Sequence, residues 1–163
     1  MTDQELKDLV ASLAIQSAKT DAKLNKIATM YGGVANNQGK VVEEFYFNTL
    51  KAKPVLGTMK FDFIDKNITR SKGAIQDEYD IILVNGKDVF IIEVKYKAHE
   101  NDLNRLLNKK YPNFKILYPE YKNYTHHLAL ATFHIEEELI QKALKNNVNI
   151  LRRKGNIIEE LVA

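Results

Sequence analysis

Two acidic residues and a lysine stand on either side of a predicted tight turn. Asp80 precedes the Asn85-Gly86 pair, and Glu93 and Lys95 follow it. The apolar, β-branched runs on both sides of this pair are typical of strands, and Asn-Gly between two such runs predicts a type I′ hairpin. Carboxylates brought together across a hairpin could hold a hard divalent cation.

The position of the turn predicts which residues share a face. With Asn-Gly as the loop, Asp80 lies opposite Ile91, and residues two apart on one strand face the same way. One face is then predicted to carry Asp80, Ile91, Glu93 and Lys95. Asp80 and Glu93 become diagonal neighbours, roughly 7–8 Å apart at the backbone. Carboxylate side chains can span that gap onto one Mg²⁺, which takes oxygen ligands.

A structural interpretation of the same residues also stands. Glu93 and Lys95 follow an apolar run, and charges inside a sheet need pairing or a metal. A plain ion pair at the end of the strand would satisfy that need. Asp80 on the same face favours the cation site.

The order Asp80, twelve further residues, then Glu93-Val94-Lys95 resembles the D…ExK signature of the PD-(D/E)XK nuclease superfamily. The resemblance covers about residues 36–135. It implies an α/β fold with a restriction-endonuclease-like αβββαβ core, in which helices flank a mixed central sheet. The chain looks most like small uncharacterised bacterial or phage-like members with an N-terminal coiled-coil helix. It departs from the pattern in having Tyr79, not proline, before the aspartate.

The resemblance also implies an activity, which is metal-dependent hydrolysis of phosphodiester bonds in nucleic acid, with DNA placed ahead of RNA. Mg²⁺ would be the cofactor and Mn²⁺ its substitute. Asp80 and Glu93 would bind the metal, with the carbonyl of Val94 as a further ligand. Lys95 would orient or activate the attacking water and stabilise charge on the phosphate. Glu43 would complete the outer metal shell.

Glu43 is chosen from a helix predicted at about residues 37–52. It shares a face with Tyr46 and Leu50, at spacings of three and seven residues, whereas Glu44 falls among polar residues. An acid on the apolar face is the unusual one, so Glu44 is only the reserve candidate. The alternative is a rim glutamate at the edge of the packed stripe.

Residues 3–31 are predicted to form a separate helix, because Gly32-Gly33 follows it. A 4-3 spacing links Leu6, Val10, Leu13, Ser17, Thr20, Leu24, Ile27 and Tyr31. This seam favours a coiled coil, and hence a homo-oligomer formed through residues 3–31. An amphipathic helix packed on its own domain explains it equally well. The predicted domains are residues 1–31 and 32–163.

The remaining pattern completes an α/β chain. A first strand is expected within residues 55–65. Residues 67–77 are expected to form a polar loop or the frayed end of a hairpin, where Arg70 and Lys72 could meet phosphates. Pro112 is expected to end a second core helix that leaves Arg105, Lys109 and Lys110 exposed. The aromatic stretch 114–124 suits either single-stranded nucleic acid or packing on the body, and packing is favoured. Later elements are a strand at 128–135, a helix at 136–146, and strands at 148–151 and 157–162.

Composition narrows the classes. The chain has 163 residues, 45% of them hydrophobic, and a net charge of +3, which permits nucleic-acid binding without requiring it. The absence of cysteine excludes a disulfide scaffold and a thiol nucleophile. The sequence has no signal-peptide pattern and no apolar run of about 20 residues, so we expect a cytoplasmic protein without a membrane partner. The rival function is a non-catalytic nucleic-acid-binding or assembly module on the same fold.

Overall fold

The computed structural model describes residues 2–163, and the side chains of residues 24–36 lie outside that description. The chain divides into two compact units, Met1–Gln38 and Gly39–Ala163. Each unit is described by itself. The boundary falls later than the expected one between residues 31 and 32.

The first unit is helical from Asp3 onward. Helix α1 runs from Asp3 to Ala52, so the expected interruption at Gly32-Gly33 and the separate helix starting near residue 37 are both wrong. Leu6, Val10 and Leu13 of the predicted seam are each more than half exposed. The later seam positions Leu24, Ile27 and Tyr31 lie among the side chains outside the description. None of the described helices is long and apolar enough to cross a membrane.

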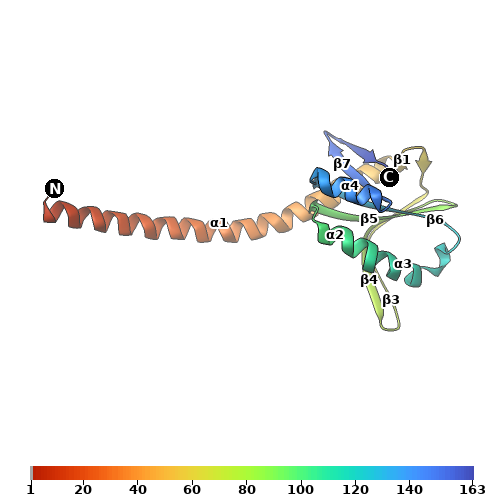
Figure 1. Ribbon diagram of the computed structural model, residues 1–163, viewed down its shortest axis with the longest axis horizontal. Helices are drawn as coiled ribbons and strands as arrows, with labels where there is room; N and C mark the ends of the chain where they lie inside the picture. The colour runs from red at the N-terminus through yellow and green to blue at the C-terminus, as the bar shows by residue number, and fades with distance from the viewer. Residues whose placement is uncertain (1) are drawn as a thin grey trace. The chain divides into compact units, whose positions relative to one another are not determined.

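The second unit is an α/β domain built on one mixed six-stranded sheet (Figure 1). The strands lie in the order β3-β4-β5-β6-β7-β8. β3 pairs antiparallel with β4, and β4 with β5; β5, β6 and β7 run parallel; β8 returns antiparallel to β7. The strand bounds are β3 Phe63–Lys72, β4 Ile75–Val84, β5 Asp88–Lys97, β6 Thr125–His134, β7 Val148–Lys154 and β8 Ile157–Leu161.

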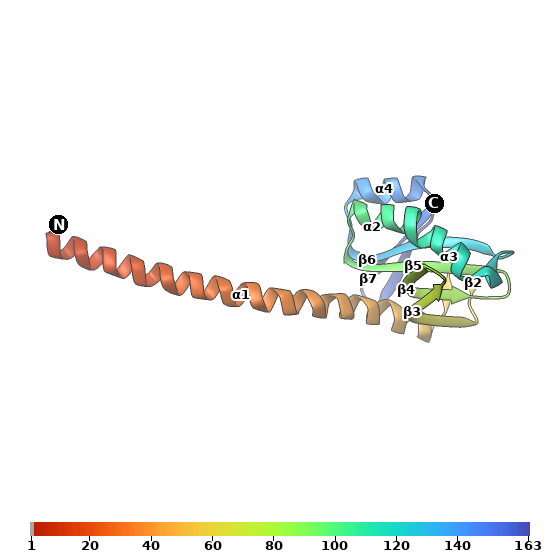
Figure 2. The same cartoon turned by 90° about the horizontal axis from the view of Figure 1, so that it is seen from below.

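Helices cover both faces of this sheet (Figure 2). One face carries α2, α3 and α4, and the other face packs on the last turns of α1 through Val42, Tyr46 and Leu50. The bounds are α2 Glu100–Arg105, a π-helical turn η1 Leu106–Lys110, α3 Tyr111–Leu117, a 3₁₀ turn η2 Pro119–Tyr121 and α4 Glu137–Lys145. The segment η2 lies between α3 and β6 in the chain. Two apolar layers therefore sandwich the central strands.

Residues 67–77 belong to a hairpin, the second of the two expected alternatives, and not to a loop. β3 continues to Lys72 and β4 begins at Ile75, around a turn with Gly73 at a φ of +61°. The residues expected to form the first strand instead make a small separate hairpin, β1 Val55–Leu56 with β2 Met59–Lys60, before β3 starts. Gly57 turns this small hairpin at a φ of +60°.

Pro112 does not end the second core helix. It lies at the start of α3, which follows directly on the π-helical turn η1. Proline is tolerated in the first turn of a helix, where its missing N–H is not required. The aromatic residues beyond it pack on the body, as favoured: Phe114 and Tyr118 are buried with ring centroids 4.6 Å apart. The late elements β6, α4, β7 and β8 form close to their predicted positions.

Candidate active site

The β4–β5 turn lies one residue later than predicted. Oδ1 of Asn85 accepts hydrogen bonds from the amides of Lys87 at 2.9 Å and Asp88 at 2.6 Å. The Asn85 amide in turn donates to the Asp88 carbonyl at 3.0 Å. Asparagine commonly opens turns by binding backbone amides two residues on. Asn85 therefore begins the turn, and Gly86 and Lys87 occupy its centre.

This displacement changes the cross-strand pairing. Ile82 lies opposite Ile91, so the predicted pairing of Asp80 with Ile91 is wrong. The ladder ends at Ile81, and one further step would set Asp80 opposite Glu93. Because the centre of the turn moves by one residue, each cross-strand partner shifts by two, so residues predicted to share a face still share it as far as the ladder extends. Asp80 lies close to Glu93, because its Oδ2 accepts a hydrogen bond from the amide of the next residue, Val94, and its charge raises the pKa of Glu93.

Asp80 lies on β4 just beyond Ile81, the last residue of β4 that pairs with β5. The Val94 amide donates a hydrogen bond of 2.8 Å to Oδ2 of Asp80. In a regular antiparallel ladder that continued this register, the amide would pair with the carbonyl of Tyr79. A side-chain carboxylate has thus replaced a backbone acceptor, and it leaves Oδ1 of Asp80 for another partner.

A second irregularity lies at the same level on β3. The β3–β4 ladder skips the Asn67–Asp80 pair, and Asn67 has a φ of +49°. Tyr79 packs in the layer under α2 and α3, whereas Ile81 packs in the layer under α1. Strict alternation would put these two odd-numbered residues on one face. The hairpin therefore exchanges its two faces at Asp80, which brings this carboxylate within range of groups on both sides of the sheet.

Glu93 is buried, with its side chain 7% exposed. Burial, followed by the charge of Asp80, raises the pKa of Glu93 to about 7. The charges of Lys110 and Lys95 act in the opposite direction, as does that of Arg105. Burial and the neighbouring carboxylate therefore favour the neutral acid more than the nearby cations favour the charged one.

Lys95 lies next to Glu93 but remains partly open to solvent, with its side chain 33% exposed. Its Nζ is 4.0 Å from Oε1 of Glu93 and 3.9 Å from Oδ1 of Asp102. Asp102 is held at the start of α2, where its Oδ2 accepts from the His99 amide at 2.8 Å. Both ion pairs are long, so Lys95 is free to adjust toward a bound group.

Glu43 approaches the site from α1. It is half-buried, whereas Glu44 is exposed, as the helical pattern predicts. Burial, and then the charge of Asp80, raises the pKa of Glu43. Tyr46, one turn further along α1, fixes this part of the helix. Its hydroxyl donates to the carbonyl of Thr132 on β6 at 2.6 Å and lies 3.0 Å from the carbonyl of Leu151 on β7. An open pocket of about 190 Å³ lies beside Glu43, lined by Lys40, Glu43, Glu44, Lys66 and Asn67.

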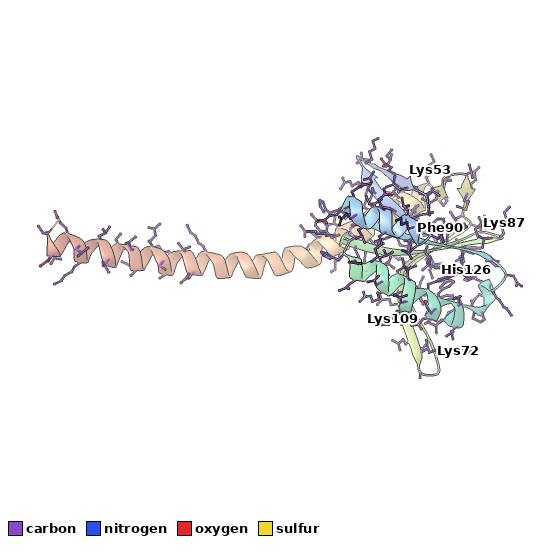
Figure 3. The ribbon with its side chains drawn as sticks, viewed as in Figure 1. Lys53, Lys72, Lys87, Phe90, Lys109 and His126 are labelled. Carbon is purple, nitrogen blue, oxygen red and sulfur yellow. The ribbon has the colours of Figure 1, made fainter. Side chains whose placement is uncertain are left out.

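Sequence reasoning missed Lys110. It was expected to be exposed with Lys109, but only Lys109 is (Figure 3). The Lys110 side chain is 10% exposed, and its Nζ lies 3.3 Å from Oδ1 of Asp77 and 3.8 Å from Oε2 of Glu93. A signal did exist: Leu103 and Lys110 are seven residues apart, which places them on one helix face.

Arg70 on β3 and the tandem histidines on β6 make contacts within the domain. Nη1 of Arg70 pairs with Oε1 of Glu120 at 2.7 Å, and its guanidinium lies 3.9 Å from the Tyr118 ring centroid. Lys72 is exposed at the end of the hairpin (Figure 3). Of the tandem histidines, His127 contacts Asp88 at 2.9 Å, and His126 lies against the aromatic cluster at residues 111–121.

The carboxylates of the site have the chemistry of ligands for a hard divalent cation. Among the residues that the structure describes, no group of three or more histidine, aspartate or glutamate side chains is arranged to hold one. Mg²⁺ needs less than this, because it commonly binds through one or two carboxylates and keeps water or substrate oxygens in its other positions. Asp80 and Glu93 fit that pattern, since their mutual repulsion is the kind that a cation relieves. The Val94 amide donates a hydrogen bond to Asp80, and the Val94 side chain is buried in the core.

Comparison with known proteins adds little. No family model matches the chain, and no curated protein matches it. A solved structure described as "Crystal Structure of Protein of Unknown Function AF1548" is similar with a TM-score of 0.46 and 15% identity. The match covers 66% of this chain and 58% of that one.

Proposed function

We propose that residues 39–163 form a metal-dependent nuclease domain of the PD-(D/E)XK type, with a restriction-endonuclease-like core. The observation that carries the proposal is the hydrogen bond from the Val94 amide to Asp80, made where β4 leaves β5. It sets one carboxylate beside the buried Glu93 of the central strand β5. Lys95 follows two residues later on the same strand.

Each of these residues has a role in phosphodiester hydrolysis. Asp80 and Glu93 would hold Mg²⁺, or Mn²⁺ in its place, with the Val94 carbonyl as a further ligand. Bound there, the metal would lower the pKa of a coordinated water and polarise the phosphate. Lys95 would hold the attacking water and offset charge that develops on the phosphate oxygens. Glu43, whose pKa responds to the charge of Asp80, would accept hydrogen bonds from metal-bound water.

The substrate class is nucleic acid, with DNA as the first candidate. Exposed lysines flank the carboxylates: Lys40 and Lys66 line the pocket beside Glu43. The charge of Arg105, from the end of α2, reaches Glu93. Cations on both sides of a metal site could bind the phosphates that flank a scissile bond.

The test is cleavage of mixed single- and double-stranded DNA and RNA with Mg²⁺ or Mn²⁺, compared with the same reaction in EDTA. Asp80→Asn should abolish cleavage while the far-UV circular dichroism spectrum stays unchanged. Asp88→Asn is the matched control, because this carboxylate lies at the opposite end of β5 and pairs with His127. Metal-independent cleavage, or equal loss in both variants, would argue against the site.

An assembly module is the second candidate, and one observation favours it. Leu6, Val10 and Leu13 expose more than half of their surface on α1. A helix of this kind gains most of its stability from packing its apolar face. We propose that residues 3–31 associate with a second copy of the chain. In the non-catalytic alternative this association would be the main activity, with nucleic acid bound but not cut.

A further inference from the structure

We infer that Lys110 permanently occupies one side of the Glu93 carboxylate and limits the site to a single divalent cation. The inference rests on the proposed function, because it concerns the same carboxylates. It assigns a role to a buried lysine that phosphodiester hydrolysis does not require. It also fixes from which side a cation reaches Glu93.

Both oxygens of Glu93 have an ammonium neighbour. Lys95 lies 4.0 Å from Oε1, and Lys110 lies 3.8 Å from Oε2. The two lysines differ in exposure, at 33% for the Lys95 side chain and 10% for that of Lys110. An exposed, flexible ammonium can move aside for an incoming cation, whereas a buried one has no solvent to move into.

Lys110 is held from several directions. Its ammonium is 3.3 Å from Asp77 and donates a hydrogen bond to the carbonyl of Glu78. It also lies 5.6 Å from the ring centroid of Tyr79, whose hydroxyl donates to the Lys110 carbonyl at 2.9 Å. Lys110 is thus bound to β4 through its backbone and its side chain together.

The partner Asp77 is itself fixed. Its Oδ2 accepts from the Asn113 side chain at 2.9 Å, and its Oδ1 accepts from the Glu78 amide at 2.8 Å. These contacts keep the counter-charge of Lys110 in place. The lysine comes at the end of the π-helical turn η1, and such turns are frequent at functional sites.

A two-metal centre would need Glu93 to offer oxygens to two cations. With Lys110 held on the Oε2 side, only Oε1 is open, on the side of the movable Lys95. Asp80 likewise has one oxygen committed to the Val94 amide. One oxygen from each carboxylate then remains, which suits one cation completed by water and substrate.

The experiment measures the number of Mn²⁺ ions bound per chain, by calorimetric titration and by electron paramagnetic resonance. Wild-type protein should bind one ion with the spectrum of an isolated Mn²⁺. Lys110→Met should bind a second ion and give exchange-coupled signals, because Asp77 and the Oε2 side of Glu93 lose their cation. Lys109→Met, which changes an exposed neighbour, should behave as the wild type.

Two Mn²⁺ ions on the wild type would overturn the inference and leave the nuclease proposal standing. One ion on both the wild type and a folded Lys110→Met, with unchanged affinity, would also overturn it. The wild-type measurement keeps the test decisive if Lys110→Met does not fold. No binding to the wild type, or binding that Asp80→Asn leaves unchanged, would instead overturn the proposed function.

Discussion

Oδ2 of Asp80 takes the Val94 amide that a continued β4–β5 ladder would have given to a backbone carbonyl. This one hydrogen bond links the two halves of the candidate site. It fixes the carboxylate on β4 to the strand that carries Glu93 and Lys95. Consequences for metal binding, stability and catalysis can be measured separately.

The first prediction concerns pH. Because burial and Asp80 raise the pKa of Glu93 from 4.5 to about 7, the folded metal-free protein binds a proton on Glu93 between these pH values that the unfolded chain releases. The stability from this group is fully present below the unfolded pKa and is lost as the pH rises through the folded pKa. At 1.36 kcal/mol per pKa unit, the loss is at most about 3 kcal/mol.

Urea unfolding in EDTA on either side of this range measures the loss. Glu93→Gln should flatten the pH dependence and be the more stable protein at the alkaline end. Saturating Mg²⁺ should remove most of the slope from the wild type only. A wild type and a Glu93→Gln variant with parallel stability profiles would contradict the assignment of this slope to Glu93.

The second prediction separates catalysis from folding at Lys95. Its two ion pairs are long and its side chain is one-third exposed, so Lys95→Met should change the free energy of unfolding by less than about 1 kcal/mol. Metal binding should persist, and cleavage should be abolished. Lys97→Met, an exposed change two residues further on β5, serves as the control. Wild-type cleavage rates in Lys95→Met would remove this lysine from the mechanism.

The third prediction concerns the attachment of α1 to the sheet. Tyr46→Phe removes a buried hydroxyl and leaves the carbonyls of Thr132 and Leu151 without that donor. We expect a loss of about 1–3 kcal/mol in the free energy of unfolding, measured with urea. Glu43 lies three residues earlier on α1, so the variant should also weaken Mn²⁺ binding modestly. Full retention of stability would show that these hydrogen bonds are not important.

The fourth prediction tests self-association through the first unit. Val10→Lys with Leu13→Lys should lower the mass found by sedimentation, because charge would enter the predicted seam. Leu9→Lys with Ile15→Lys is the matched control, since both residues are exposed but lie outside the 4-3 spacing. An equal effect from the two double variants would indicate nonspecific hydrophobic association of the helix. A monomeric wild type would end the idea.

The alternation of apolar residues predicted β4 and β5 well, and the helical spacing separated the half-buried Glu43 from the exposed Glu44. These patterns depend on neighbours along the chain. The turn was misplaced by one residue because the Asn85 side chain, not the Asn-Gly backbone alone, organises it. Asp80 and Glu93 still lie together. Moving the centre of the turn by one residue shifts each cross-strand partner by two, which keeps the predicted faces matched.

Other features depend on contacts distant in sequence. The polar stretch 67–77 forms strands because residues such as Ile68 and Ile75 pack under the helices. Lys110 is buried because Asp77 and Glu93, far away in the chain, compensate its charge. Lysine is usually a surface residue, so the sequence alone predicts that Lys110 is exposed. Its burial follows only from the ion pairs formed in the folded domain.

The left-handed backbone conformation of Asn67 within β3 has a consequence for the protein in concentrated solution. β3 is one edge of the sheet, and a long, regular edge would invite pairing with the edge of another molecule. Asn67, with its φ of +49°, makes the backbone of β3 irregular, and Asp65 and Lys66 place charges just before it. The irregularity that releases Asp80 toward the candidate site thus also guards the domain against intermolecular β-sheet aggregation.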